Sequence, residues 1–219
     1  MSDYLWVVLL GVPAAHEDNF NRIYDEDHLG HMMTIKGVTS CSRYRLHWSD
    51  NTPDEMPKYL AIYEMDRPEL PRSPEWKHQA TLGAWPSEMR PHTTVRKNGC
   101  YRRISQHKQE SSLGSSIYFL LQGVPAEIEP RFNELYGSNH IPLMLQAPGV
   151  NGATRFKLEY TDSGDMPDYL AIYDIANPET ARSPEWKHQT NLGAWPTIRP
   201  HFTARRNGAF ERISRHGPK

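Results

Sequence analysis

The sequence predicts an α+β fold in which two ferredoxin-like βαββαβ repeats pack sheet to sheet within one chain. The first observation is a duplication: the string RSPEWKHQ stands at Arg72–Gln79 and again at Arg182–Gln189. The second is that strand-like and helix-like segments follow one another as β-α-β-β-α-β in each half. The third is physical, because right-handed crossovers place both helices on one sheet face and leave the other face without cover. A second copy in the same chain can cover it.

Other motifs recur in the same order, so the duplication spans nearly the whole chain. Their offset of roughly 110 residues is the length of a domain rather than of a solenoid unit. We expect a first α-β barrel repeat at 1–108, a Ser/Gly-rich linker at 109–116 and a second repeat at 117–219. The recurring pairs are Gly11–Ala14 with Gly123–Ala126, Met56–Pro57 with Met166–Pro167, Tyr59–Tyr63 with Tyr169–Tyr173, Leu82–Pro86 with Leu192–Pro196, and Asn98–Gly99 with Asn207–Gly208.

The first half of each repeat is predicted to run strand, helix, strand. Tyr4–Leu10 is apolar and rich in β-formers, which favours a buried strand. Ala15–Met33 carries apolar and aromatic residues at three- and four-residue steps, which favours a helix with one buried face. Val38–Trp48 alternates as a strand does. Its two faces are expected to carry Cys41, Arg43, Arg45 and His47 on one side, and Ser42, Tyr44, Leu46 and Trp48 on the other.

The second half of each repeat is predicted to run strand, helix, strand again, beginning with the strand Lys58–Met65. Ser73 before Pro74 indicates a helix start, because a serine hydroxyl caps free N–H groups and proline suits the first helical position. Gly83 offers the stop. His92–Ile104 closes the repeat as a strand, with Asn98–Gly99 as a bulge or tight turn.

Composition excludes several classes of function. The 25 basic and 26 acidic residues balance to a net charge of -1, which gives no electrostatic footprint for nucleic acid. No segment is long and apolar enough to span a bilayer, so no membrane association is expected. The two cysteines, Cys41 and Cys100, are too few for a disulfide framework and are expected to be small buried apolar residues. A cytoplasmic location follows as the expectation.

One helix resembles that of a known family. Tyr24 and His28 in the first repeat, and Tyr136, His140, Pro142 and Met144 in the second, resemble the Tyr-x3-His-x-Pro-x-Met helix of EthD-type proteins. These proteins belong to the dimeric α-β barrel superfamily. The resemblance implies a pseudo-dimer within the chain, with a small-molecule pocket between helices and sheet in each repeat. The first repeat has Gly30 in place of the proline, followed by His31, so the two pockets need not be equivalent.

Acid–base chemistry is the function that these helices favour. Tyr24 and His28 are spaced i, i+4 and share one helical face, as do Tyr136 and His140. A histidine titrates near neutral pH and can take a proton, while a neighbouring phenol orients or protonates a substrate oxygen. The alternative is that these residues only pack in the core. In the second predicted helix, His78 and His188 are further catalytic candidates, with contact to the opposite repeat as their alternative.

Substrate binding has its own candidates. Arg43 and Arg155 lie in the middle of predicted strands, where a cation either stabilises an enolate or carboxylate or pairs with a carboxylate across the interface. His92 and His201 could face the pocket from the last strand or lie at its edge in water. The aromatic candidates, which alternatively anchor packing, are Trp76, Trp186, Trp85 and Trp195.

No cofactor is expected. The pair His28 and His31 has helical spacing for a metal, but Leu143 replaces the second histidine in the other repeat, so no metal is predicted. Neither a phosphate-binding loop nor a nucleophile elbow is present, and no motif selects a haem ligand.

Three functions remain open. The leading one is a cofactor-independent lyase or isomerase that uses His/Tyr acid–base chemistry on a small apolar, aromatic or oxygenated substrate, as in aromatic compound catabolism. The others are a cofactor-free or haem-dependent monooxygenase and a non-catalytic ligand-binding protein. Pairing of the pseudo-dimer into a further homodimer is also open.

Overall fold

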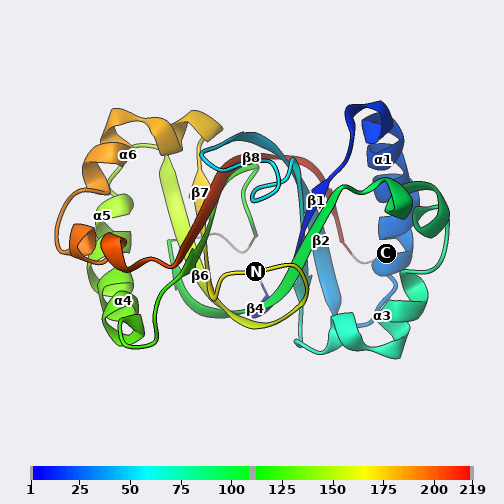
Figure 1. The fold of residues 1–219 in the computed structure, drawn as a ribbon, viewed down its shortest axis with the longest axis horizontal. Coiled ribbons are helices and arrows are strands. Elements are labelled where there is room, and N and C mark those ends of the chain that lie inside the picture. The colour runs from blue at the N-terminus through cyan, green and yellow to red at the C-terminus, as the bar shows by residue number, and fades with distance from the viewer. Residues whose placement is uncertain (1, 109–111, 218–219) are drawn as a thin grey trace.

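The computed structural model describes residues 2–108 and 112–217, so residues 109–111 of the expected linker lie outside the described residues. It contains a closed antiparallel barrel flanked on two sides by helices (Figure 1). Around the barrel the strands follow the order β1-β3-β2-β8-β5-β7-β6-β4. They are β1 (Tyr4–Gly11), β2 (Val38–Ser49), β3 (Tyr59–Met65), β4 (Val95–His107), β5 (Ser116–Gly123), β6 (Val150–Ser163), β7 (Tyr169–Ile175) and β8 (Ala204–His216).

Each repeat contributes half of the barrel in the strand order expected of a ferredoxin-like sheet. The first half is β4-β1-β3-β2 and the second is β8-β5-β7-β6. The two halves are joined along both edges, since β2 pairs with β8 and β4 pairs with β6. Edge-to-edge pairing satisfies the N–H and C=O groups that an open sheet would leave free. The predicted fold class is therefore confirmed, and the halves are also hydrogen-bonded into one barrel.

Helices cover the outer face of each half. In the first repeat α1 (Glu17–Ile23) continues through a π-helical turn, Tyr24–His28, into α2 (Leu29–Met32), and α3 (Pro74–Gln79) lies beside it. The second repeat has α4 (Glu129–Leu135), the π-helical turn Tyr136–His140, α5 (Ile141–Met144) and α6 (Pro184–Gln189). In Figure 1 the two helical layers lie on opposite sides of the barrel.

Alternation along the strands separates three cores. On β1, Leu5, Val7 and Leu9 point into the barrel, where they meet side chains of the second repeat such as Phe119. Their neighbours Trp6, Val8 and Leu10 point to the helices of the first repeat. The second repeat has an equivalent helix-facing core. The barrel interior is thus the surface that the two repeats bury against each other, as the sequence predicts.

Two sequence predictions need correction. Trp48 was expected on the same face as Tyr44, but a register shift between Leu46 and Trp48 turns it outward, and it packs in the helix-facing core of the second repeat. A β-bulge reverses the alternation in this way. The last strand begins at Val95 rather than at His92, because Arg90–His92 forms a 3₁₀ turn.

Both copies of the repeated octapeptide serve the same local structure. The Ser73 hydroxyl accepts a hydrogen bond from the Trp76 N–H at 3.1 Å, and Ser183 caps α6 through the Trp186 N–H at 3.0 Å. Such caps satisfy N–H groups that the first helical turn leaves free. Cys41 and Cys100 are both buried and free, as expected. In the described part of the chain, the helices are all too short or too polar to cross a bilayer.

The packing of the two repeats inside the barrel gives a testable prediction. Phe210 on β8 is fully buried inside the barrel, with its ring centroid 6.0 Å from that of Phe119. Replacing Phe210 by Ala should lower the free energy of unfolding by about 3–5 kcal/mol, because the cavity would lie where the repeats join. Ile213, on the same strand but 42% exposed, is the matched control, and Ile213→Ala should cost less than about 1 kcal/mol in urea unfolding. Equal losses would contradict a core that lies within the barrel.

Candidate functional site

The Tyr/His pairs lie on the π-helical turns that interrupt the long helix of each repeat. Tyr136 and His140 are the first and last residues of one turn, and Tyr24 and His28 occupy the same places in the other. The ring centroids are 5.1 Å apart in the second repeat and 5.0 Å apart in the first. π-Helical turns are rare and occur often at functional sites. The turn directs both rings toward the sheet.

The repeated Leu-Gly-Ala-Trp-Pro segment holds a tryptophan against each histidine. Trp195 stacks on His140 with ring centroids 4.1 Å apart and an interplanar angle of 14°. The Ala194 N–H donates to Asn139 Oδ1 at 3.1 Å, which ties this segment to the π-helical turn. Gly193 has a φ of +64°, and a Cβ there would collide with the Asn139 side chain. The glycine is therefore required by both conformation and space.

Behind each histidine lies a pair of hydrogen-bonded phenols. The Tyr173 hydroxyl donates to the Tyr136 hydroxyl at 3.2 Å, and the Tyr24 and Tyr63 hydroxyls are 3.0 Å apart. The guanidinium of Arg155 lies 4.1 Å from the centroid of the Tyr136 ring, on which it can make a cation–π contact.

Burial fixes the protonation of these groups. Desolvation, reinforced by the positive charges of Arg199 and Arg155, lowers the pKa of His140 to about 3. Desolvation, with Arg90 next in importance, likewise lowers the pKa of His28 to about 3. Burial raises the pKa of Tyr136, and it raises that of Tyr173 well above its ordinary value. At neutral pH the site therefore presents neutral imidazoles and protonated phenols.

The second repeat encloses a cavity of about 570 Å³ between its helices and its sheet. Its wall is aromatic and its rim is charged, with four cationic side chains and one carboxylate. The aromatic lining is Trp48, Tyr118, His140, Tyr173, Trp186, Trp195 and Phe202, and the charged lining is Asp50, Arg182, Lys187, Arg199 and Arg205. The volume lies in the range of small-molecule pockets.

Two arginines of the rim lie close enough to repel each other. Burial, and then the charge of Arg205, lower the pKa of Arg199. Arg199 is held by hydrogen bonds to the Asn191 side chain at 2.8 Å and to the Thr190 carbonyl. Arg205 donates to the Tyr118 hydroxyl at 3.1 Å. Fixed cations beside a low-polarity wall favour an anionic ligand.

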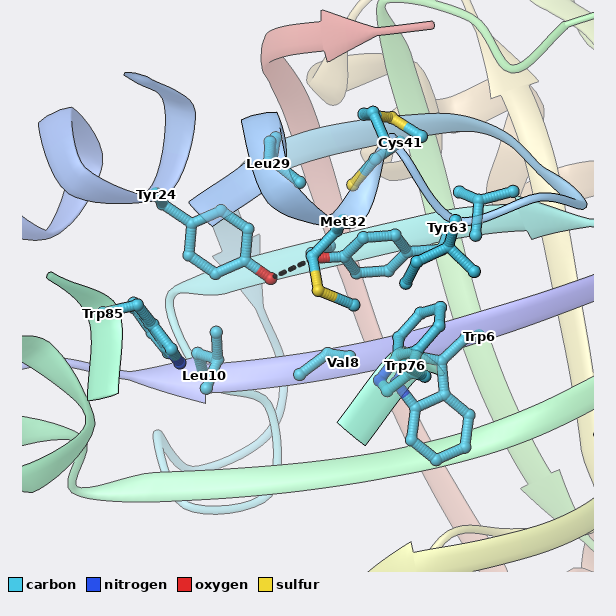
Figure 2. Packing of buried hydrophobic residues seen from close by; sticks show 14 of the residues in the cluster. Trp6, Val8, Leu10, Tyr24, Leu29, Met32, Cys41, Tyr63, Trp76 and Trp85 are labelled. Atoms are coloured by element: carbon cyan, nitrogen blue, oxygen red, sulfur yellow. Dashed lines mark hydrogen bonds between the residues drawn. The ribbon is translucent and has the colours of Figure 1, made fainter. Parts of the chain in front are cut away.

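The equivalent space in the first repeat is nearly filled, with a cavity of about 40 Å³. Trp6 stands where the second repeat has Tyr118, and its ring contacts Trp76 at 6.4 Å and Tyr160 at 5.9 Å between centroids. In Figure 2 the side chains of Val8, Leu10 and Met32 lie between Trp85 and the Trp6–Trp76 pair. The bulk of these side chains leaves no room for a ligand of several rings.

Each repeat contributes one aromatic ring that packs against the helix-facing core of the other repeat, and an arginine lies on each ring. On the first repeat, Arg72 lies 3.5 Å from the Tyr160 ring centroid and forms an ion pair with Asp162 at 2.6 Å. On the second, Arg182 lies 3.9 Å from the Trp48 ring centroid, and both residues line the pocket. Asp50, the counterpart of Asp162, forms no ion pair within the described ranges.

The structure brings some predicted site residues together and leaves others apart. His28, His140, Tyr24, Trp76, Trp186, Trp85 and Trp195 line one pocket or the other, and Tyr136 supports Tyr173 from behind. His78, His188, His92 and His201 are exposed and lie outside both linings. Arg43 and Arg155 are buried behind the tyrosines, outside both linings. Gly30 and His31 do not distinguish the two pockets, since neither lines the first.

Two lining arginines were not predicted, although each lies close to a residue that was singled out. Arg182 is the first residue of the repeated octapeptide, and Arg199 stands two residues before His201. In both segments the histidine was taken as the candidate instead. Trp48 was missed because the bulge that exposes it to the other repeat leaves no trace in the alternation.

The surroundings of His140 can be compared with those of a haem or metal ligand. A ligating histidine normally donates its second ring N–H to a carboxylate or carbonyl. The Nδ1 of His140 is buried without a partner among the described residues, and the ring stacks on Trp195. These surroundings do not fit an axial haem ligand. Within residues 2–108 and 112–217, no three His, Cys, Asp or Glu side chains gather as metal ligands would.

No protein-family model matches the sequence, and no curated protein does either. Solved structures match over nearly the whole length. An anthrone oxidase-like protein is 10% identical, with a TM-score of 0.69 over 99% of this chain and 94% of its own. A putative monooxygenase from Fusobacterium nucleatum subsp. nucleatum is 10% identical, with a TM-score of 0.60 over 98% and 94%. A mutant chlorite dismutase from Candidatus Nitrospira defluvii is 10% identical, with a TM-score of 0.60 over 96% and 92%.

At such identities the likeness shows the fold alone. These neighbours are ferredoxin-fold proteins of the dimeric α-β barrel type, so the match supports the predicted fold and nothing narrower. The narrower likeness to EthD proteins stays a prediction.

The buried histidines predict an acid-sensitive stability. The pKa of His28 and of His140 is about 3 in the folded state, against an ordinary value of 6.5. Their contribution to the free energy of unfolding is therefore complete above pH 6.5 and is lost as the pH falls from 6.5 toward 3. Below about pH 6 each should cost about 1.4 kcal/mol of unfolding free energy per pH unit. Urea unfolding from pH 7 to 4 should therefore show a steeper loss for the wild type than for a variant carrying both His28→Phe and His140→Phe. Parallel curves would mean that the histidines titrate normally.

Proposed function

We propose that the second repeat is the working half of the chain and that its pocket carries acid–base chemistry on a flat, aromatic or oxygenated small molecule that bears or develops negative charge. One observation supports this above all: a cavity of about 570 Å³ combines an aromatic wall, a neutral histidine and a cationic rim, while its counterpart measures about 40 Å³. The proposal rests on this site and not on the fold, which serves many reactions.

Binding follows from the lining. Flat rings stack on Trp195 and Trp186 and remove apolar surface from water. The guanidinium groups of Arg199 and Arg205 then attract a carboxylate, phenolate or enolate at the mouth. Because these two arginines repel each other, an anion between them relieves that repulsion as well as pairing with both.

Proton transfer would use His140 as the acceptor. The imidazole is wholly neutral at pH 7, so its lone pair is free, but its pKa of about 3 makes the free pocket a weak base. A substrate anion next to Arg199 cancels part of the positive field that holds this pKa down, and the substrate thereby raises the basicity of the group that deprotonates it. Tyr173 keeps its proton, and when the phenol pair reverses so that Tyr136 donates to Tyr173, the Tyr173 hydroxyl donates a hydrogen bond to the substrate oxygen on which charge develops.

Several outcomes share this first step. Return of the proton to another carbon is an isomerisation, and loss of a leaving group or cleavage of a carbon–carbon bond is a lyase reaction. The Tyr136 to Met144 segment, which resembles the EthD helix in full, belongs to this pocket and supports the same assignment.

Oxygenation is a second candidate, favoured by the names of the structural neighbours, which include anthrone oxidase-like and monooxygenase. An electron-rich carbanion or phenolate held in the aromatic pocket can react with O₂ by electron transfer without a redox group from the chain. Oxygen uptake during turnover separates this reaction from isomerisation or cleavage. A ligand carrier without turnover is the third possibility.

Ligand binding provides a prediction that needs no known substrate. We expect 2-naphthoate to quench tryptophan fluorescence and to bind about tenfold more tightly than uncharged 2-naphthamide, because the rim cations each contribute a charge-assisted contact. Arg199→Met should reduce this preference several-fold, because one of the contributing cations is lost. Arg90, at the same place in the first repeat, lines the nearly filled pocket, so Arg90→Met should leave it unchanged. If both variants behave alike, the second pocket is not the binding site.

Turnover tests the role of His140 directly. Substrates to screen are hydroxylated anthrones and related aromatic ketones, followed by absorbance and an oxygen electrode. On an active substrate, His140→Ala should lower kcat by about 10²- to 10⁴-fold, the usual contribution of a general base. His28→Ala, the same change in the filled pocket, should retain kcat. Undiminished turnover in folded His140→Ala would remove this histidine from the mechanism.

A further inference from the structure

In the first repeat, one carboxylate gathers three donors behind the phenol pair. Asp25 lies on the π-helical turn, and its Oδ2 accepts from Arg43 Nη1 at 2.5 Å. Its Oδ1 accepts from the Ser214 hydroxyl at 2.5 Å and lies 3.3 Å from His216 Nε2. Arg43 is 2% exposed, so this carboxylate is the counter-charge that a buried guanidinium requires.

The second repeat reproduces the donors but not the carboxylate. Arg155 pairs in register with Ser105, as Arg43 does with Ser214. His107 pairs with Ala153, as His216 does with Cys41. The residue at the place of Asp25 is Gly137.

The equivalent donors in the second repeat lack a carboxylate acceptor. The Ser105 hydroxyl and His107 Nε2 are both buried without a hydrogen-bond partner in the described part of the chain. Arg155 is 4% exposed and forms no ion pair with any described carboxylate, although Asn133 Oδ1 accepts from its Nη2 at 2.6 Å. Buried polar groups left unpaired in this way cost free energy, and a buried cation costs most.

The helix leaves open space at Gly137 itself. A Cβ added to Gly137 would have no atom within 4 Å. Asp25, at the matching place, keeps 26% of its side chain exposed, so this position can be reached from solvent.

We propose that the second repeat binds a small carboxylate, such as formate, acetate or the carboxylate end of a larger metabolite, in the space beside Gly137. One oxygen would accept from Arg155, and the other from the Ser105 hydroxyl and the Nε2–H of His107, as the oxygens of Asp25 do in the first repeat. Two oxygens in one plane match these donors better than a spherical anion does.

This site is distinct from the aromatic pocket and does not depend on the proposed function. Arg155 lies against the ring of Tyr136, whose hydroxyl accepts from the pocket residue Tyr173. The bound anion would therefore lie on the far side of Tyr136 from the pocket. It would neutralise one of the two charges that lower the pKa of His140.

Thermal unfolding in sodium formate, compared with sodium chloride at the same ionic strength, tests the site with a defined probe. Formate should raise the Tm of the wild type with a saturable dependence, because a ligand of the folded state stabilises it by mass action. Gly137→Asp supplies the carboxylate covalently, so this variant should have a higher Tm without formate and no specific response to it. Gly137→Ala is the control for helix propensity and should keep the response.

Two further variants complete the test. Asp25→Gly should create a second formate site, seen as a doubled stoichiometry in calorimetric titration and as partial rescue of a lowered Tm. Ser105→Ala should weaken formate binding about tenfold, the effect of losing one hydrogen bond to a charged group. An equal response to formate in wild type and Gly137→Asp would overturn the proposal, as would equal effects of formate and chloride on the wild type.

Discussion

The burial of two bare sheet faces against each other is the constraint from which the rest of this structure follows. A four-stranded ferredoxin-like sheet has helices on one face only, and here Leu5, Val7 and Leu9 of one repeat meet Phe119 and its neighbours of the other. The sheets also pair along both edges, β2 with β8 and β6 with β4. This pairing carries Trp48 on β2 and Tyr160 on β6 to the helix-facing core of the opposite repeat. The pocket of the second repeat is thus completed by Trp48 of the first.

Duplication has allowed the two halves to differ while the scaffold stays the same. The Tyr/His turn, the stacked tryptophan and the phenol pair are present in both repeats. In the first repeat, however, Trp6 replaces Tyr118, Arg72 pairs with Asp162, and the pocket is nearly filled. The second repeat keeps its cavity. The same contrast recurs behind the phenols, where Asp25 satisfies one arginine and Gly137 leaves the other without a carboxylate. Behind the phenols, the first repeat supplies its own carboxylate, and the second is left with donors that a carboxylate would match.

Much of the fold could be predicted from the sequence, because repetition, hydrophobic period and caps such as Ser73–Pro74 are local signals. The placement of both helices on one sheet face followed from the right-handedness of the crossovers. The site was predicted less well, and for physical reasons. A bulge near Trp48 changes which face a side chain occupies without changing the pattern of residues. The difference between an open and a filled pocket depends on ring volumes at positions far apart in the chain, such as Trp6 and Tyr160, which no single motif contains. The exposed His78 and His92 occur in repeated motifs because those motifs build turns and caps, so repetition alone did not separate structural residues from functional ones.

The central claim is that an aromatic anion has one place to bind in this chain, under the helices of the second repeat. A crystal structure of the protein soaked in 2-naphthoate tests it most directly. The account predicts density for the rings between Trp186 and Trp195, with the carboxylate toward Arg199 and Arg205, and no ligand beside His28. Density under the helices of the first repeat, or a ligand bound away from both histidines, would contradict it.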